Sequence, residues 1–355
     1  MQKIWHKIIN TRSNPLYWPV LFVLWIISVA YRLGRSVVLM LNNPTVRTRA
    51  AVISVGNLTV GGTGKTPMVI ALGKHLIESG KRVGVVSSGY GRRFEKDIMG
   101  AGSELVSGSV LDLGDEVLVL AFELPEAYFS VSKSKSEAAR MLDEKHDLDV
   151  ILVDDGYQHI RLHRDFNILL MEAGLDLRKE SVFPLGTLRE GLDAADRADA
   201  IIFTKSNFGS VADGFSRRVE EQYGDKVIAG VEYYNENAVS KAEKMAVDDL
   251  ADNKIYFFAG IGGYASLLDH LQGRFSNIVG HRQFSDHCSY RPADAAAIMS
   301  DIGRFEPEYV VTTYKDYVKL RSFDFGQPLY YLDLKLNFTS GYDRLCHAIE
   351  KMVEE

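Results

Sequence analysis

VGNLTVGGTGKTP, residues Val55–Pro67, is the stretch of this sequence that decides its fold. It follows a short apolar run, residues 51–55, and leads into residues 65–79, where apolar side chains recur at helical spacing. A glycine-rich turn between a strand and a helix lets backbone N–H groups converge on phosphate oxygens. We therefore predict a Walker A phosphate-binding loop inside an α/β domain.

The residue types in this loop suit nucleotide binding. Lys65 can reach the β- and γ-phosphates, and the Thr66 hydroxyl can ligate Mg²⁺. Pro67 falls in the first helical turn, where its missing N–H costs little. Thr59 stands where the strict pattern has glycine, and Gly56 is the candidate for the early turn. A glycine-rich turn without a ligand is the alternative interpretation. The predicted ATP-binding residues are Gly61, Gly62, Thr63, Gly64, Lys65 and Thr66.

Outward from the loop, short apolar runs alternate with helical segments, which is typical of a parallel sheet with crossover helices. We expect a doubly wound α/β domain over residues 46–225, a smaller α/β domain over residues 226–355, and an N-terminal anchor region over residues 1–45. The predicted strands are 51–55, 82–88, 127–131, 149–153, 166–171, 200–204, 226–234, 254–260, 309–313 and 328–334, and the predicted helices are 65–79, 133–145 and 342–353.

Length and composition limit the possible functions. The 355 residues suggest two domains, since a domain typically has about 100 to 200 residues. The net charge of -6 argues against generic binding of nucleic acid, which depends on clustered Lys and Arg. The two cysteines are too few for a disulfide framework or a cysteine-rich zinc site. We interpret Cys288, next to His287, as a packing residue.

Residues 13–31, SNPLYWPVLFVLWIISVAY, contain no charged side chain. The stretch lies at the lower limit of the about 20 residues that a spanning helix needs, and its Trp and Tyr residues favour the membrane interface. It can span the bilayer or lie in its surface; a cleaved signal peptide and a buried core helix are the alternatives. We expect a retained anchor with a cytosolic body, and the basic flanks suit anionic headgroups.

Acidic residues follow several of the predicted strands and turns. Asp154 and Asp155 end an apolar run, where a parallel sheet places its ligands, and we predict that they serve Mg²⁺. A helix cap followed by a turn is the alternative for this pair. Asp115, in a Gly-Asp-Glu sequence, can equally be part of an acidic helix N-terminus, and His287 can equally lie in a surface loop.

Four basic residues follow predicted strand ends or glycine turns, where they can contact an anionic substrate. They are Arg92, His159, Arg161 and Arg189. A planar guanidinium suits phosphate recognition. A solvated surface charge is the alternative for each of the four.

These segments together resemble the tetraacyldisaccharide 4'-kinase family over nearly the whole chain. The resemblance rests on the anchor and on VGNLTVGGTGKTP (55–67), SSGYGRR (87–93), GDE (114–116), VDDGYQH (153–159), PLGTLRE (184–190), AGIG (259–262), SDHCSY (285–290) and TTYKDYVKL (312–320). It implies an enzyme that transfers the γ-phosphate of ATP, with Mg²⁺, to the 4'-hydroxyl of tetraacyldisaccharide 1-phosphate, forming lipid IVA in lipid A biosynthesis. It also implies a place on the cytoplasmic face of the inner membrane, an acylated disaccharide phosphate and an anionic membrane surface as partners, and neither nucleic acid nor an obligate protein partner.

The resemblance also implies residue roles. Asp115 and His287 match the family's catalytic residues, Asp154 and Asp155 its acidic pair for Mg²⁺ and phosphates, and Gln158 joins the four basic residues as a substrate contact. The sequence departs from the family pattern at Ser88, Val117 and Tyr314, where the family usually has Arg, Pro and Glu. Two rival functions are a P-loop switch or motor ATPase that controls a membrane partner, and a kinase for a different acceptor.

Overall fold

The chain forms two compact units in a computed structural model, and each unit combines segments that are far apart in the sequence. The structure describes residues 5, 8–9, 11, 14–41, 45–92, 96–178, 180–205 and 215–354. Unit 1 comprises Met1–Thr63, Asp155–Val231 and Phe338–Glu355, and unit 2 comprises Gly64–Asp154 and Glu232–Asn337. The division at residue 225 predicted from the sequence stays a prediction.

Unit 1 is built on parallel strands that are buried along most of their length, as expected for strands covered on both faces. They are β1 (Ala51–Asn57), β6 (Phe166–Glu172), β7 (Ala200–Thr204) and the first part of β8 (Val227–Val239), paired in that order. The helical elements of this unit include η2 (Leu192–Arg197), α8 (Phe215–Gln222) and α12 (Tyr342–Glu354). Phe203 and Phe215 pack together in its core, so α8 covers part of the sheet.

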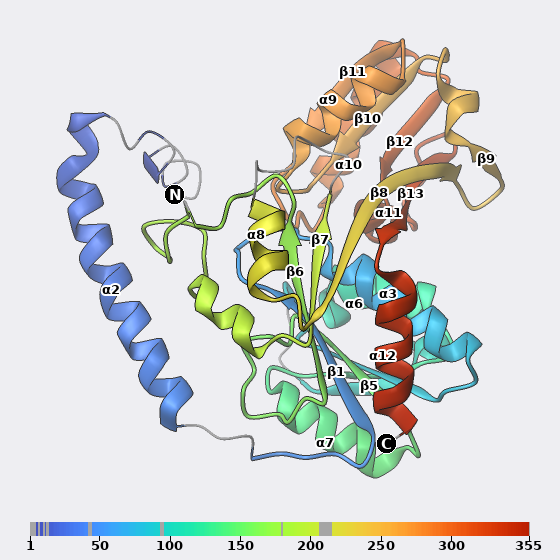
Figure 1. The fold of residues 1–355 in the computed structure, drawn as a ribbon. Coiled ribbons are helices and arrows are strands. Elements are labelled where there is room, and N and C mark those ends of the chain that lie inside the picture. The colour runs from blue at the N-terminus through green and yellow to red at the C-terminus, as the bar shows by residue number, and fades with distance from the viewer. Residues whose placement is uncertain are drawn as a thin grey trace. The chain divides into compact units, whose positions relative to one another are not determined.

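The N-terminal apolar stretch forms η1 (Pro15–Tyr17) and α2 (Trp18–Leu41), and Figure 1 shows α2 as a long helix. Pro15–Leu39 is long and apolar enough to cross a membrane, and only 6% of its most apolar window is buried. The exposure contradicts the alternative of a buried core helix. Polar residues attach α2 to unit 1: Ser28 Oγ donates to the Val182 carbonyl (2.7 Å), and Arg35 pairs with Glu190 (3.1 Å).

The first segment of unit 2 has a sheet of three parallel strands with an antiparallel strand at its edge. The strands are β5 (Val150–Asp154), β2 (Val83–Ser87), β4 (Tyr128–Val131) and β3 (Ile98–Ala101), paired in that order. The helices are α3 (Lys65–Glu78), α4 (Gly102–Leu105), α5 (Val110–Leu113), α6 (Asp115–Glu123) and α7 (Lys135–Lys145). All strands predicted in this segment are present; β3 is short and half-buried, and the hydrophobic pattern did not predict it.

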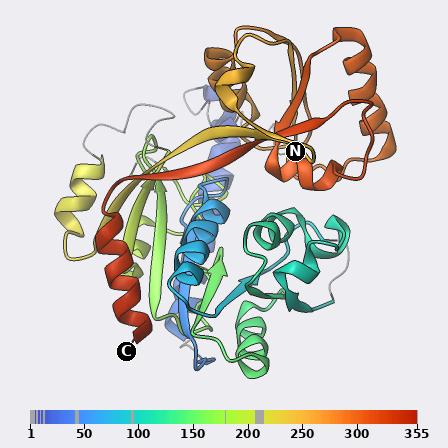
Figure 2. The ribbon, with the colours of Figure 1, turned by 90° about the vertical axis from the view of Figure 1, so that its right-hand side faces the viewer.

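The second segment of unit 2, largely orange in Figure 2, has parallel strands with helices on both faces. The strands are β11 (Ile278–Gln283), β10 (Ile255–Ala259), β12 (Tyr309–Thr313) and β13 (Leu329–Ser340), paired in that order. A short strand, β9 (Lys244–Ala246), pairs with β8. The helical elements are η3 (Val247–Leu250), α9 (Tyr264–Arg274), α10 (Pro292–Phe305) and α11 (Tyr314–Leu320). Phe257 packs with α9 and its neighbour Phe258 with residues of α10, because adjacent side chains of a strand point to opposite faces. Strand β11 was not predicted, because its outer half, His281-Arg282-Gln283, is polar.

Candidate active site

The predicted phosphate loop leads directly into α3, and Gly64 is the N-cap residue of that helix. Gly64 has a φ of 89°, in the left-handed region that glycine adopts without steric cost. A Cβ atom at this position would lie 1.8 Å from Tyr233 Oη, which donates a hydrogen bond to the Gly64 carbonyl oxygen at 3.3 Å. Backbone conformation and available space therefore both require glycine here. This turn sets Lys65 and Thr66 in the first turn of α3.

Three residues of the loop precede Gly64 in the chain. Gly61 and Gly62 are exposed, so their backbone groups are accessible to a ligand. Thr63 is buried, and its hydroxyl has no hydrogen-bond partner within the part of the chain that the structure describes. A buried polar group without a partner costs free energy, which a polar ligand at the loop would offset.

The acidic pair follows β5, as predicted, but its two carboxylates have different surroundings. Asp154 ends the strand and is buried, and its backbone carbonyl accepts a hydrogen bond from Lys135 Nζ at 2.6 Å. Asp155 has a φ of 52°, and both of its carboxylate oxygens lie within 3.0 Å of Arg189 Nη1. Arg189 also contacts Gln158 Oε1 at 3.4 Å, so three of the predicted site residues form one polar group.

Asp115 and His287 contact each other, although 172 residues separate them in the sequence. Asp115 is the first residue of α6 and is buried, which places its charge at the positive end of the helix dipole. His287 lies in the turn after β11 with a φ of 55°, an uncommon conformation for a residue other than glycine. Its Nδ1 atom is 3.2 Å from Asp115 Oδ2 and 3.3 Å from Oδ1, and its ring packs edge-on against that of Tyr90.

Two lysines of α11 complete the surroundings of this pair. Lys319 Nζ lies 3.1 Å from Asp115 Oδ2, and the lysine side chain is 2% exposed. Lys315 is more open; its Nζ lies 3.3 Å from Glu116, 3.4 Å from His287 Nε2 and 3.6 Å from Asp115 Oδ2. Residues four apart lie on the same face of a helix, so α11 directs both cations at the same carboxylate.

Opposing effects act on the pKa of Asp115. Burial raises it, but the hydrogen bond from His287 and the charges of Lys315 and Lys319 lower it more, so that the pKa lies well below its ordinary value. Burial lowers the pKa of Lys315, and the carboxylates of Glu116 and Asp115 raise it above its ordinary value. Asp115 is therefore ionised at neutral pH. Because a carboxylate only accepts hydrogen bonds, His287 Nδ1 must carry the hydrogen that they share.

The remaining predicted substrate contacts vary in how much of the side chain is accessible. The Arg92 guanidinium donates to the carbonyls of Lys96 and Val131, and the Gln158 amide donates to the Asn57 carbonyl at 2.9 Å. The side chain of Arg161 is exposed, and that of His159 is half-buried. Arg92 and Gln158 thus support the backbone around their loops, while Arg161 presents its charge to solvent.

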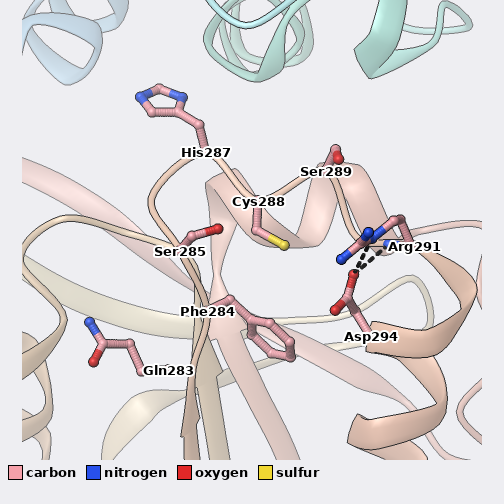
Figure 3. A pocket seen from close by; sticks show the side chains of 8 residues that line it. All are labelled: Gln283, Phe284, Ser285, His287, Cys288, Ser289, Arg291 and Asp294. Carbon is pink, nitrogen blue, oxygen red and sulfur yellow. Dashed lines mark hydrogen bonds and ion pairs between the residues drawn. The ribbon is translucent and has the colours of Figure 1, made fainter. Parts of the chain in front are cut away.

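A hollow beside the His287 turn is lined by residues 283–285, 287–289, 291 and 294. Figure 3 shows the His287 side chain pointing away from those of Phe284 and Arg291. The Nδ1 atom of His287 contacts Asp115 instead. Burial raises the pKa of the Cys288 thiol above its ordinary value. A raised pKa disfavours the nucleophilic thiolate, in agreement with a packing role for Cys288.

The sequence analysis did not identify Lys319 or Tyr233 as parts of the site. The spacing of Lys315 and Lys319 after a predicted strand was the available signal, since it places both on one helix face. The departures from the family pattern also have structural surroundings. Val117 is fully buried, and the Tyr314 ring stacks on that of Tyr331 with the ring centroids 4.3 Å apart.

Comparison with known proteins gives one consistent result. A family model described as tetraacyldisaccharide-1-P 4'-kinase (LpxK) matches residues 20–354. The tetraacyldisaccharide 4'-kinases of Geobacter metallireducens and Geobacter sulfurreducens are each 35% identical to this chain, covering 82% of it and 83% and 79% of their own lengths. A crystal structure of LpxK from Aquifex aeolicus in complex with ATP superposes with a TM-score of 0.77 at 26% identity, covering 94% of this chain and 99% of that one. The predicted P-loop α/β fold class is thus confirmed, and the chain belongs to the tetraacyldisaccharide-1-P 4'-kinase family.

Proposed function

We propose that this chain is an ATP-dependent kinase that transfers the γ-phosphoryl group to the 4'-hydroxyl of tetraacyldisaccharide 1-phosphate, forming lipid IVA in lipid A biosynthesis. Its family membership supports this reaction, and the related LpxK of Aquifex aeolicus has been crystallised with ATP. The observation that carries the proposal is the contact between Asp115 and His287, which provides a proton acceptor for a sugar hydroxyl.

The geometry offers two routes for that proton. It can move to Asp115 directly, or to His287 Nε2 while Asp115 balances the charge of the imidazolium. The lowered pKa of Asp115 makes its carboxylate a weak base, which favours the second route. In the neutral imidazole, Nε2 carries a lone pair, and Lys315 Nζ is 3.4 Å from it. We assign Nε2 as the acceptor and Lys315 as the group that yields this position to the hydroxyl.

The phosphates of ATP would bind the Gly61–Thr66 loop, with Lys65 contacting the β- and γ-phosphates and the helix N-terminus favouring their negative charge. Thr66 and Asp154 have the oxygen donors that Mg²⁺ prefers. Bound Mg²⁺ would neutralise charge on the transferring phosphoryl group. Among the described residues there is no group of three or more His, Cys, Asp or Glu that could hold a metal. Asp155 is the weaker candidate ligand, because Arg189 contacts both of its carboxylate oxygens.

The substrate is a lipid, and the exposed apolar helix α2 suits an enzyme that works at a membrane surface. Confinement to the surface raises the effective concentration at which enzyme and lipid meet. We propose attachment to the cytoplasmic face of the inner membrane, where ATP is available, with anionic headgroups near the basic flanks of the helix. Within the predicted substrate set, we assign the exposed Arg161 to an anionic group of the lipid. No nucleic acid and no obligate protein partner is needed for this reaction.

The test is transfer of labelled γ-phosphate from ATP to tetraacyldisaccharide 1-phosphate in detergent micelles. Label should appear at the 4' position with the unmodified chain and be lost with Lys65→Ala. His287→Gln should lower turnover by about 10²- to 10⁴-fold, the usual contribution of general base catalysis, without changing ATP affinity. Phosphate release at the same rate with and without the lipid would instead indicate a switch ATPase. Label on a different acceptor would indicate a kinase for that acceptor.

A further inference from the structure

The α11 motif, residues 312–320, supplies a buried cation to Asp115. We propose that Lys319, held in place by Asp316, is a positioning residue that fixes the Asp115 carboxylate in contact with His287. The proposal rests on the proposed function, in which this pair accepts the proton of the substrate hydroxyl. Lys319 itself does not contact the substrate, because its side chain is 2% exposed.

Burial of a lysine ammonium is costly unless carboxylates compensate its charge, and two of them do so here. Lys319 Nζ lies 3.1 Å from Asp115 Oδ2 and 3.4 Å from Asp316 Oδ1. Asp316 is fully buried, and its Oδ2 accepts hydrogen bonds from the Gly260 N–H (2.9 Å) and the Thr313 hydroxyl (2.7 Å). These bonds fix Asp316, Asp316 fixes the ammonium, and the ammonium holds one oxygen of Asp115.

The other charged groups around Asp115 are placed differently. His287 approaches from the turn after β11, with Asp286 Oδ1 3.9 Å from its Nε2. Lys315 approaches from α11 and also forms an ion pair with Glu116, the next residue of α6. α3 also packs against α6, but its Lys74 pairs with Glu123 at the opposite end of α6. Lys319 is therefore the cation most deeply buried against Asp115, while the Lys315 side chain is 23% exposed.

This arrangement predicts that substitutions of Lys319 and Asp316 shift the titration midpoint of the Asp115–His287 pair in opposite directions. Lys319→Met removes a positive charge, which raises the proton affinity of the Asp115–His287 pair. Asp316→Asn removes a negative charge but keeps a side-chain oxygen that can accept from the Gly260 N–H or the Thr313 hydroxyl, so Lys319 stays beside Asp115. The charge of Lys319 is then compensated by Asp115 alone, which lowers the proton affinity of the Asp115–His287 pair. An opposite charge within this range typically changes a carboxyl pKa by about one to three units, so we expect midpoint shifts of roughly one pH unit upward and a smaller shift downward.

The experiment measures turnover against pH for the full-length chain in micelles, with ATP and tetraacyldisaccharide 1-phosphate saturating. The acidic midpoint of the pH profile should rise with Lys319→Met and fall with Asp316→Asn. On the plateau of the profile, Lys319→Met should lower kcat about 10-fold, while the KM for ATP stays within about 2-fold of the wild-type value. Asp301→Asn is the matched control, because it disrupts the ion pair of the buried Asp301 with the partly exposed Arg282 elsewhere in the same unit. It should leave the midpoint unchanged.

A second readout does not depend on turnover. NMR titration of ¹³C-labelled histidine, with the His287 signal assigned by its loss in His287→Gln, should show the same two shifts in the midpoint of the Asp115–His287 pair. Shifts of the same sign, or no shift, would overturn the proposal, and so would an Asp301→Asn shift equal to that of Lys319→Met. If Lys319→Met does not fold, Asp316→Asn decides alone, since an unchanged or raised midpoint contradicts the positioning role. If the wild-type chain does not phosphorylate the lipid, the proposed function fails, but the titration still tests the positioning of Asp115.

Discussion

Substitution of Gly64 by alanine tests the structure of the phosphate loop most directly. Gly64 has a φ of 89°, and a non-glycine residue in the left-handed region costs about 1 to 2 kcal/mol. The new Cβ would also lie 1.8 Å from Tyr233 Oη and 2.5 Å from its Cζ, and Tyr233 is buried, so the ring must move. Overpacking of this kind typically costs about 1 to 3 kcal/mol more. The sum is about 2 to 5 kcal/mol.

Gly62→Ala is the matched control in the same loop, because a Cβ atom there meets nothing within 4 Å and its φ is not positive. Thermal unfolding without nucleotide should show a fall in Tm of about 4 °C or more for Gly64→Ala and little change for Gly62→Ala. The Gly64→Ala chain should also bind ATP weakly in calorimetry, because the turn that begins α3 is displaced. Equal melting temperatures for the two variants would refute this account of the loop.

Substitutions of Tyr233 separate the steric cost of Gly64→Ala from the cost of its backbone conformation. Tyr233→Phe deletes the hydroxyl but leaves Cζ at 2.5 Å, so it should not rescue Gly64→Ala. Tyr233→Ala in the Gly64→Ala background removes the ring, and should recover the overpacking cost but not the cost of the backbone conformation. The loss measured for the double variant relative to the sum of the single losses gives their coupling energy.

Three further predictions concern charge and the membrane. The pKa of Asp115 is lowered in the folded chain, so its charge contributes its full stabilisation at pH values above the ordinary carboxyl pKa of about 4, and this contribution is lost as the pH falls further. Asp115→Asn should therefore weaken the fall of Tm below pH 4. An unchanged pH dependence of Tm would contradict the buried ion pairs. Arg189→Met and Asp155→Asn should show a coupling energy of about 0.5 kcal/mol or more in a double-mutant cycle of unfolding, since both oxygens of Asp155 contact the guanidinium, and strictly additive losses would argue against that contact. Phe22→Ser with Trp25→Ser should reduce co-sedimentation with anionic vesicles several-fold while leaving ATP binding intact, because these side chains are 62% and 51% exposed on α2; undiminished sedimentation would place the lipid contact elsewhere.

Several elements could be predicted from the sequence because their signals are local. The apolar runs at residues 150–153 and 200–204 are strands, since strands buried on both faces need almost continuous apolar side chains. The edge strand β11 was missed because its outer half is polar, so the alternation that identifies a strand is weak. Helices α4 to α6 and α8 to α11 were also missed. For α4 and α5 the reason is their length, because four residues are too few for a helical period to emerge.

The candidate site shows the same limit. The roles of Asp115 and His287 came from a resemblance. Taken alone, Asp115 also agreed with an acidic helix N-terminus, and His287 with a surface loop. Their contact arises from α6 and the turn after β11, which the fold brings together across 172 residues. The surroundings of the acidic pair were also not evident, since Asp154 and Asp155 are neighbours in the chain but Asp154 is buried at the strand end while Asp155 pairs with Arg189.

The sequence by itself determined the phosphate loop, most of the buried parallel strands, the apolar N-terminal helix and the family, because each depends on residue type and spacing along the chain. Tertiary structure alone decided that Tyr233 excludes every residue but glycine at position 64, and that Lys319 is buried against Asp115. It also decided that α2 is exposed and not part of a core. The physical reason is that steric exclusion and electrostatic interaction act over a few ångströms in space, and the fold sets those distances between residues far apart in the chain.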